Sequence, residues 1–210
     1  MPENTPLPQR GFWFHLIDIT LNIVIIVAIV ATIRTFIVSP FQVEGSSMND
    51  TLLHKEYIII NKFKYLFDDP KRGDIVVFHP TLDADKYYVK RIIGLPGDTI
   101  AIRDGYVYLR DSNGNEKRLD EGYLSPKNAG HTFRAPVTSG DTREIVYTIP
   151  DDNYFVLGDN RLGSLDSRSF TNVEGSPAPY VPGERIKGSV WFVALPITKI
   201  HAIEPPDYGL

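Results

Sequence analysis

The stretch "YYVKRIIGLPGDTIAIRDGYVYLR", Tyr87 to Arg110, decides the fold class of this chain. It contains short runs rich in β-branched and aromatic residues, separated by the turn-forming sequences "GLPGD" and "DG". Runs of this length, bounded by glycine, proline and aspartate, are typical of strands joined by tight turns. The stretch therefore predicts a β-sheet.

Further runs of the same character lie on both sides of it. They are "EYIIINKF" (56–63), "GDIVVFHP" (73–80), "EIVYTIP" (144–150), "NYFVLGD" (153–159) and "GSVWFVALP" (188–196). Because few helical periods interrupt them, the region 35–210 is predicted to be one mostly antiparallel β domain. A polar, turn-rich segment at about 111–143 is predicted to be an excursion from this domain and not a domain of its own.

An apolar run, "GFWFHLIDITLNIVIIVAIVATI" (Gly11 to Ile33), precedes the β domain and carries Asp18 as its only formal charge. A helix of about 22 residues is roughly 33 Å long, enough to cross a hydrocarbon layer of about 30 Å. Its second half, Ile23 to Ile33, shows no polar face, which disfavours a buried core helix, and no clear cleavage site follows the run, which disfavours a removed signal peptide. We therefore predict a short tail over 1–11 and one transmembrane anchor over 12–34.

Composition narrows the possible chemistry. The chain has 210 residues, 42% of them hydrophobic, and a net charge of -4. This charge lacks the basic excess of nucleic-acid-binding proteins, so no nucleic-acid partner is predicted. The chain has no cysteine, which excludes disulfides and a cysteine nucleophile. No zinc signature, GxGxxG sequence or P-loop is present, so no metal and no cofactor are predicted.

Two adjacent serines, Ser46 and Ser47, lie in the turn-rich segment "FQVEGSSMNDTLLHKEYIII" (41–60). Neither lies in a GxSxG sequence, which marks the nucleophile of many serine hydrolases. The five histidines are scattered, and His54, seven residues after Ser47, is the best candidate among them for a base.

Lysine is the other base that can serve a serine. A solvated lysine is neutral in only about four molecules in ten thousand at pH 7, so a catalytic lysine must be buried among apolar residues. Lys90 has such a setting, and strand alternation places it on the same face as Tyr88 and opposite Arg91. The alternative is that Lys90 faces solvent on an edge strand while Arg91 is held inside.

With Ser47 and Lys90 paired, the chain resembles the type I signal peptidases, membrane-anchored serine/lysine proteases that remove signal peptides from exported proteins. Five motifs in order carry the resemblance over nearly the whole β domain: "PFQVEGSSMNDTL", "KRGDIVVF", "YYVKRIIGLPGD", "GDNRLGSLDSR" and "VPGERIKGSVWF". The resemblance implies a β catalytic domain behind one anchor. It also implies preprotein signal peptides and the lipid bilayer as partners.

The resemblance also assigns roles to residues. Ser47 is the expected nucleophile, Lys90 the expected general base, and Ser164 is expected to hydrogen-bond Lys90 and orient it. Two ion pairs are expected to support the site: Asp166 with Arg168, and Asp159 with Arg91. An apolar pocket for small signal-peptide side chains is expected from Phe41, Val43, Gly45, Met48, Leu52, Tyr88 and Val89. Phe41 and Val43 are equally compatible with a place in the core.

Two positions depart from the family pattern. Gly45 stands where some relatives have a serine that donates to the oxyanion, which leaves the second oxyanion donor open. Asp50 stands where the family usually has proline, and its presence predicts a looser turn after Ser47 and an altered titration of Lys90.

The resemblance places the protein in the cytoplasmic (inner) membrane, with the catalytic domain on the extracytoplasmic side. The charges near the anchor, Arg10 and Arg34, favour neither orientation.

Two other functions fit parts of the sequence. A self-cleaving repressor-type peptidase shares the serine/lysine chemistry, but the anchor and the lack of a DNA-binding region disfavour it. A catalytically silent, anchored β domain that binds protein partners would tolerate Asp50 and Gly45 more easily.

Overall fold

The computed structural model describes residues 11–83, 85–133 and 144–210. The chain divides into two compact units, with the boundary between Val38 and Ser39. The tail predicted over 1–11 lies outside the described residues except for Gly11, and so does the end of the excursion predicted at about 111–143.

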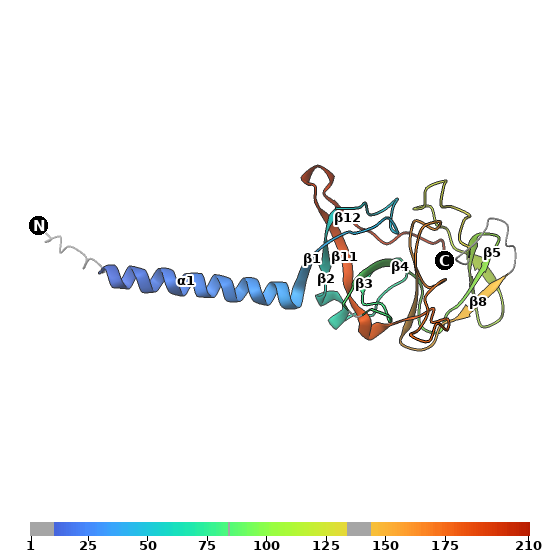
Figure 1. Ribbon diagram of the computed structural model, residues 1–210, viewed down its shortest axis with the longest axis horizontal. Helices are drawn as coiled ribbons and strands as arrows, with labels where there is room; N and C mark the ends of the chain where they lie inside the picture. Colours follow the sequence, from blue (N-terminus) through green and yellow to red (C-terminus); the bar gives the residue numbers. More distant parts are fainter. Residues whose placement is uncertain (1–10, 84, 134–143) are drawn as a thin grey trace, which may run out of the picture. The chain divides into compact units, whose positions relative to one another are not determined.

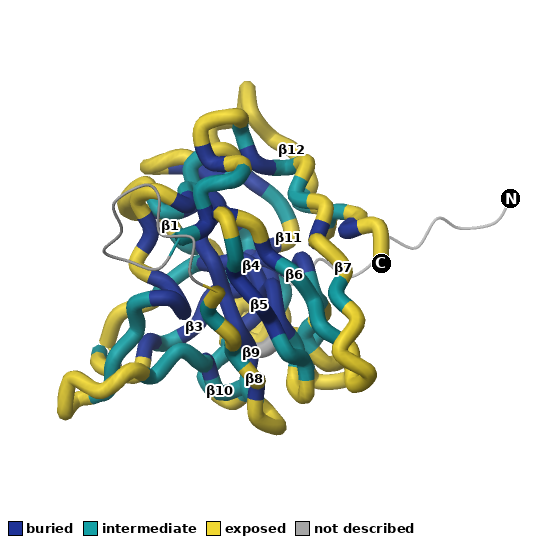
Figure 2. The backbone as a smooth tube through the Cα atoms, turned by 90° about the vertical axis from the view of Figure 1, so that its right-hand side faces the viewer, coloured by how far each residue is buried: buried dark blue, intermediate teal, exposed yellow. Residues whose placement is uncertain are grey.

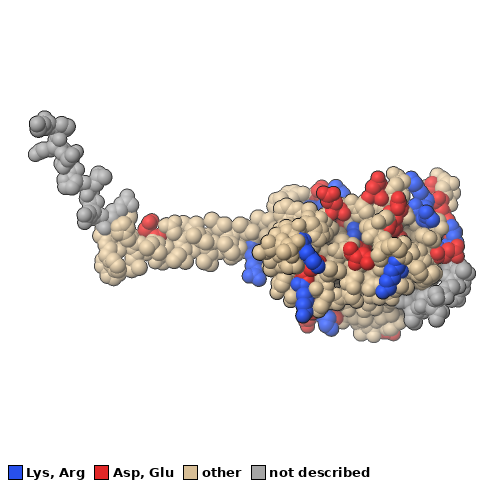
Figure 3. Space-filling model, turned by 90° about the horizontal axis from the view of Figure 1, so that it is seen from above, with Lys and Arg blue, Asp and Glu red and all other residues tan. Residues whose placement is uncertain are grey.

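The first unit is a single helix, α1 (Phe12–Thr32), which continues into a π-helical turn over Ile33–Ile37 (Figure 1). The stretch Phe12–Thr35 is long and apolar enough to span a membrane, with a mean hydropathy of 2.6 and no buried residue in its most apolar window. Figure 3 shows few charged side chains along it, whereas both signs are frequent on the second unit. The polar side chain of Asn22 donates a hydrogen bond to the Asp18 carbonyl, which satisfies it within the helix.

An eight-stranded sheet forms most of the second unit. Its strands are β1 (Val38–Gln42), β2 (Tyr57–Asn61), β3 (Ile75–Phe78), β4 (Tyr88–Gly94), β9 (Asn153–Leu157), β10 (Val181–Pro182), β11 (Ile186–Leu195) and β12 (His201–Ala202). The order is β1-β2-β11-β3-β4-β9-β10, with β12 on β11. β4 lies inside the sheet, antiparallel to both β3 and β9.

A second, four-stranded sheet has the order β7-β6-β5-β8. Its strands are β5 (Thr99–Arg103), β6 (Tyr106–Arg110), β7 (Glu116–Arg118) and β8 (Ile145–Thr148). β5 and β6 form a hairpin whose two turn residues, Asp104 and Gly105, both have positive φ, of 53° and 79°. Such a turn matches the right-handed twist of the strands, which explains the "DG" sequence.

The prediction of a mostly antiparallel β domain is confirmed. Each run that was predicted to be a strand contains one, and the stretch 98–110 contains the β5–β6 hairpin. The short strands β1, β7, β10 and β12 are additional to the prediction.

The core holds the segment after β1 in place. Met48 and Leu52 are 1% and 0% exposed, and they belong to one apolar cluster with residues of β2, β3 and β11. Figure 2 shows that burial is concentrated along β3, β4, β5 and β9. Burying two side chains on either side of a turn fixes its backbone against the sheet, so the position of Ser47 depends on this core.

Candidate active site

A cleft of about 610 Å³ lies in the second unit between the segment that begins in β1 and the start of β4. Ser47, Lys90 and the predicted pocket residues Phe41, Val43, Gly45, Tyr88 and Val89 all line it. Sequence reasoning did not identify the other wall residues, which include Ile58, Val77, Gly163 and Leu165.

Met48 and Leu52 do not line this cleft, although the sequence predicts them in the same pocket. Both lie in the core, in the same cluster as the wall residues Val43, Ile58 and Val77. The segment after Ser47 is irregular, so strand alternation does not tell which of its side chains face the cleft. Their role here is to support the wall.

Lys90 and Ser47 both line the cleft and contact each other. The Lys90 Nζ donates hydrogen bonds of 2.8 Å to the Ser47 Oγ and to the Val89 carbonyl oxygen. Lys90 is 4% exposed, and its Nζ lies 5.5 Å from the centre of the Tyr88 ring. Lys90 is therefore not the solvent-facing edge residue of the alternative interpretation, because β4 is an interior strand.

Burial changes the acidity of this lysine. It lowers the pKa of Lys90 from 10.5 to about 8, although the carboxylates of Asp166 and Asp159 partly oppose the shift. With a pKa of about 8, roughly one Lys90 in ten is neutral at pH 7. The pair thus combines a hydroxyl with an amine that can accept its proton. Asp50 does not contribute to the shift, so its predicted influence on Lys90 is absent.

Both expected ion pairs are present. The Arg91 guanidinium donates to the two carboxylate oxygens of Asp159 at 3.0 and 2.7 Å, and Thr51 donates to the same carboxylate at 2.5 Å. Thr51, four residues after Ser47, was not identified from the sequence. This pair connects the turn after Ser47 with β4 and with the loop after β9.

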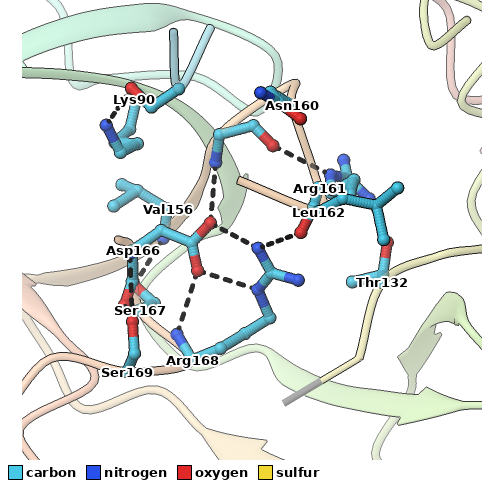
Figure 4. Close-up of polar contacts among 12 residues, drawn as sticks. Lys90, Thr132, Val156, Asn160, Arg161, Leu162, Asp166, Ser167, Arg168 and Ser169 are labelled. Carbon is cyan, nitrogen blue, oxygen red and sulfur yellow. Dashed lines mark hydrogen bonds and ion pairs between the residues drawn. The ribbon is translucent and has the colours of Figure 1, made fainter. Parts of the chain in front are cut away.

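Asp166 and Arg168 form the second pair (Figure 4). The Arg168 guanidinium donates to both carboxylate oxygens at 2.8 Å, and the Gly158 N–H donates to one of them at 3.0 Å. Burial raises the pKa of Asp166, but the charge and hydrogen bonds of Arg168 outweigh it, so the pKa lies below its ordinary value. Asp166 is therefore ionised at neutral pH.

The predicted hydrogen bond between Ser164 and Lys90 is not formed. Lys90 donates to Ser47 and Val89 instead, and the buried Ser164 hydroxyl acts on Asp166, whose pKa it helps to lower. Ser164 packs tightly against Gly158, where an added Cβ would lie 2.1 Å from its Oγ.

Asn160 is a further residue that sequence reasoning gave no role. Its backbone N–H donates to the Ser47 carbonyl oxygen at 3.1 Å, and its side-chain amide donates to the Ser46 carbonyl oxygen at 3.0 Å. Two successive carbonyls of the serine pair are therefore held by one residue of the "GDNRLGSLDSR" loop. Only its place in that motif pointed to the site.

A backbone N–H is the candidate donor for an oxyanion. The N–H of Gly45 donates to the Nδ1 of His54 at 3.1 Å, so His54 holds the loop before Ser47 and is not the partner of the Ser47 hydroxyl. Within the described part of the chain, the N–H of Ser47 donates to no recorded acceptor, which leaves it available to a substrate oxygen.

Comparison with known proteins identifies the family of this chain. Residues 16–195 match the family described as signal peptidase, peptidase S26. The chain is 41% identical to signal peptidase I P of Bacillus subtilis subsp. natto, over 74% of this chain and 80% of that protein. It is 36% identical to the probable signal peptidase I-2 of Synechocystis sp., over 92% and 78%.

The crystal structure of a signal peptidase I from Enterococcus faecalis V583 is 31% identical in sequence and covers 58% of this chain and 97% of that chain, with a TM-score of 0.41. The family match spans most of the length, and the two relatives are aligned over most of both sequences. The chain belongs to the peptidase S26 family and is a hydrolase of the signal peptidase I class.

Proposed function

We propose that this protein is a membrane-anchored serine endopeptidase that removes N-terminal signal peptides from exported preproteins, with Ser47 as nucleophile and Lys90 as general base. The observation that carries the proposal is the 2.8 Å contact between the Ser47 Oγ and the Nζ of a lysine that is 4% exposed. A hydroxyl needs a base within hydrogen-bond reach to attack a carbonyl, and burial supplies the neutral amine.

The first half of the reaction forms an acyl enzyme. Neutral Lys90 takes the proton of the Ser47 hydroxyl as the oxygen attacks the scissile carbonyl carbon, and the Ser47 N–H donates to the oxyanion that develops. The bond from Nζ to the Val89 carbonyl orients the amine. Lys90 then gives the proton to the leaving amine of the mature protein.

The second half releases the signal peptide. Lys90, neutral again, removes a proton from a water molecule that attacks the ester carbonyl, and it returns that proton to the Ser47 oxygen. A bound signal peptide would cover the cleft and exclude bulk water from Lys90. The exclusion of water would also strengthen the hydrogen bond from the Ser47 N–H to the oxyanion.

The cleft walls suit small aliphatic side chains of the substrate. Phe41, Val43, Ile58 and Val77 present apolar surface to the cleft, so a charged substrate side chain would lose its hydration there without a partner.

The anchor helix supplies the contact with lipid in this proposal. A span of 24 residues with a mean hydropathy of 2.6 suits the hydrocarbon layer. Orientation of the catalytic unit toward the extracytoplasmic side follows from the function, because exported preproteins are processed there.

The test is cleavage of a purified preprotein in detergent or lipid, with N-terminal sequencing of the product. We expect Ser47→Ala and Lys90→Ala each to lower the cleavage rate by about 10³-fold or more. Ser46→Ala and Lys187→Ala are matched controls, because Ser46 does not contact Lys90 and Lys187 is exposed on β11. Cleavage at the parent rate by either dyad variant would show that the dyad is misassigned.

A further inference from the structure

The loop that follows β9 is bound by a segment far from Ser47 in the sequence, residues 121–133. We call this segment the brace. Glu121 accepts two hydrogen bonds from the Arg161 guanidinium, at 2.6 and 3.0 Å, and this ion pair is almost completely buried. At the other end of the brace, the Phe133 carbonyl accepts a hydrogen bond of 2.8 Å from Arg168. The brace is therefore fixed to the catalytic domain by charged, buried contacts.

The brace also reaches the turn after Ser47. The Asp50 Oδ2 accepts a hydrogen bond of 2.7 Å from the Asn128 side-chain amide and one of 3.1 Å from the Ser125 N–H. The Asn128 Oδ1 accepts a hydrogen bond of 3.4 Å from the Leu162 N–H. Asn128 is only 2% exposed, so it connects the Ser47 turn, the brace and the loop after β9 at a buried point.

The ionic state of Asp50 favours this contact. Burial raises the pKa of Asp50, but the hydrogen bonds from Asn128 and Ser125 and the nearby charge of Lys127 outweigh it and hold the pKa below its ordinary value. Asp50 is thus a carboxylate at neutral pH, and charged acceptors make the stronger hydrogen bonds.

The backbone conformation of Asp50 is incompatible with proline. Its φ is 95°, a conformation that proline cannot adopt because its ring holds φ near −65°. A residue other than glycine is disfavoured at this φ, although aspartate and asparagine tolerate positive φ better than most residues do. The turn predicted to be loose for want of proline is instead held by a side chain that proline lacks.

We propose that Asp50 and Asn128 are positioning residues that hold the Ser47 hydroxyl at hydrogen-bond distance from Lys90 by fastening the Ser47 turn to the brace. The proposal rests on the proposed function, because it assumes that Ser47 and Lys90 are the dyad. Asn160 contacts the Ser47 carbonyl from the loop that Asn128 fixes through Leu162. Asn128 therefore contacts both the turn that carries Ser47, through Asp50, and the loop that carries Asn160, through Leu162.

Position 50 has two properties that substitutions can separate, its backbone conformation and its carboxylate. Asp50→Gly keeps the positive φ and removes the hydrogen bonds, whereas Asp50→Asn keeps an oxygen acceptor. Asp50→Pro introduces the residue usual in the family and forbids the observed φ. Asp152→Gly is the matched control, because Asp152 also has positive φ, of 56°, in the turn before β9 and does not line the cleft.

Cleavage kinetics on a preprotein would show the effect. We expect Asp50→Gly and Asn128→Ala to lower kcat by about 10-fold to 100-fold with KM changed by less than about 3-fold, because a small displacement of a nucleophile slows the chemical step. Asp50→Asn and Asp152→Gly should stay within about 3-fold of the parent, and Asp50→Pro should lose at least as much as Asp50→Gly. The double variant Asp50→Gly/Asn128→Ala should lose about as much as the more impaired of the two single variants, because both changes remove the same hydrogen bond between Asp50 and Asn128.

A pH profile distinguishes positioning from general destabilisation. A loosened turn admits water to Lys90, and water stabilises its ammonium form and raises its pKa. The rise of kcat with pH should therefore occur at higher pH in Asp50→Gly and Asn128→Ala than in the parent, when measured below their melting temperatures. A variant that is only less stable would show the rise of kcat at the same pH as the parent. Parent-like kcat in both variants, additive losses in the double variant, or a rise of kcat at the same pH as the parent would each overturn the inference. Failure of the proposed function would look different, because the parent would then cleave no preprotein or would cleave it without need of Ser47 and Lys90.

Discussion

Lys90 can act as a base only while it is neutral, and its burial on an interior strand decides at which pH that happens. The structure lowers its pKa from 10.5 to about 8 through burial, and two carboxylates limit the shift. Moving either carboxylate away would lower the pKa further, so the ion pairs around the site also set the working pH.

The first prediction is a pH profile set by this lysine. We expect kcat/KM for preprotein cleavage to rise about tenfold per pH unit up to a pH of about 8 and to level off above it, because only the neutral amine of Lys90 accepts the Ser47 proton. A kcat/KM that levels off near pH 6.5 would indicate a histidine base instead. His54→Ala is the control, and its profile should level off at the same pH as that of the parent even if its rate is lower.

The second prediction concerns stability. The folded state lowers the pKa of Lys90, so below a pH of about 8 the folded protein carries the cost of a buried ammonium, and this cost disappears as the pH rises toward 10.5. We expect Lys90→Met to be more stable than the parent at pH 6, and the gain should shrink by about 2 to 3 kcal/mol at pH 10.

Urea unfolding at the two pH values measures this difference, with Ser47→Ala as the control that keeps the lysine. An equal gain at both pH values would mean that Lys90 is not desolvated in the folded state. A gain that shrinks with pH as stated would mean that the fold gives up stability at Lys90 for the sake of function.

At the scale of the elements, the end of β9 fixes the geometry of the site by close approach. A Cβ added at Gly158 would lie 2.4 Å from the Ser47 carbonyl oxygen and 2.1 Å from the Ser164 Oγ. The absence of a side chain lets the Ser47 turn and the loop after β9 pack directly on this strand end.

The third prediction follows from that approach. Gly158→Ala should lower the free energy of unfolding by about 1 to 3 kcal/mol and preprotein cleavage by at least about 10-fold, because the Ser47 backbone must move away. Gly183→Ala is the matched control, since an added Cβ there meets Tyr154 at an ordinary 3.4 Å. Parent activity in Gly158→Ala would mean that the turn can shift without moving the Ser47 hydroxyl.

The elements also show how far sequence reasoning reached. Apolar runs of strand length predicted the long strands, because each crosses the core and needs β-branched or aromatic residues. β7, β10 and β12 have only two or three residues, too few for a pattern. The apolar setting of Lys90 made it a candidate base for a serine, and the resemblance then assigned Ser47 as its partner. The contact of Asp50 with Asn128 joins positions 78 residues apart and lies in irregular segments, where no periodicity indicates which side chains meet.

At the scale of the whole molecule, the candidate active site and the apolar helix belong to different compact units. All the cleft residues belong to the unit Ser39–Leu210, which has its own core, whereas α1 buries no residue. In the proposed function, the apolar helix supplies attachment to the membrane, and the second unit supplies the chemistry.

The last prediction tests this division. A variant lacking residues 1–34 should fold and cleave a short soluble signal-peptide substrate in detergent within about tenfold of the parent, because the dyad and its supports lie in the second unit. It should also be released from membranes by alkaline carbonate, which does not extract a spanning helix. An unrelated apolar helix of 24 residues in place of Phe12–Thr35 should restore resistance to extraction, because length and hydropathy, not sequence, determine spanning. If the shortened variant is folded but inactive on the soluble peptide, the anchor contributes to catalysis itself and the division into independent units fails.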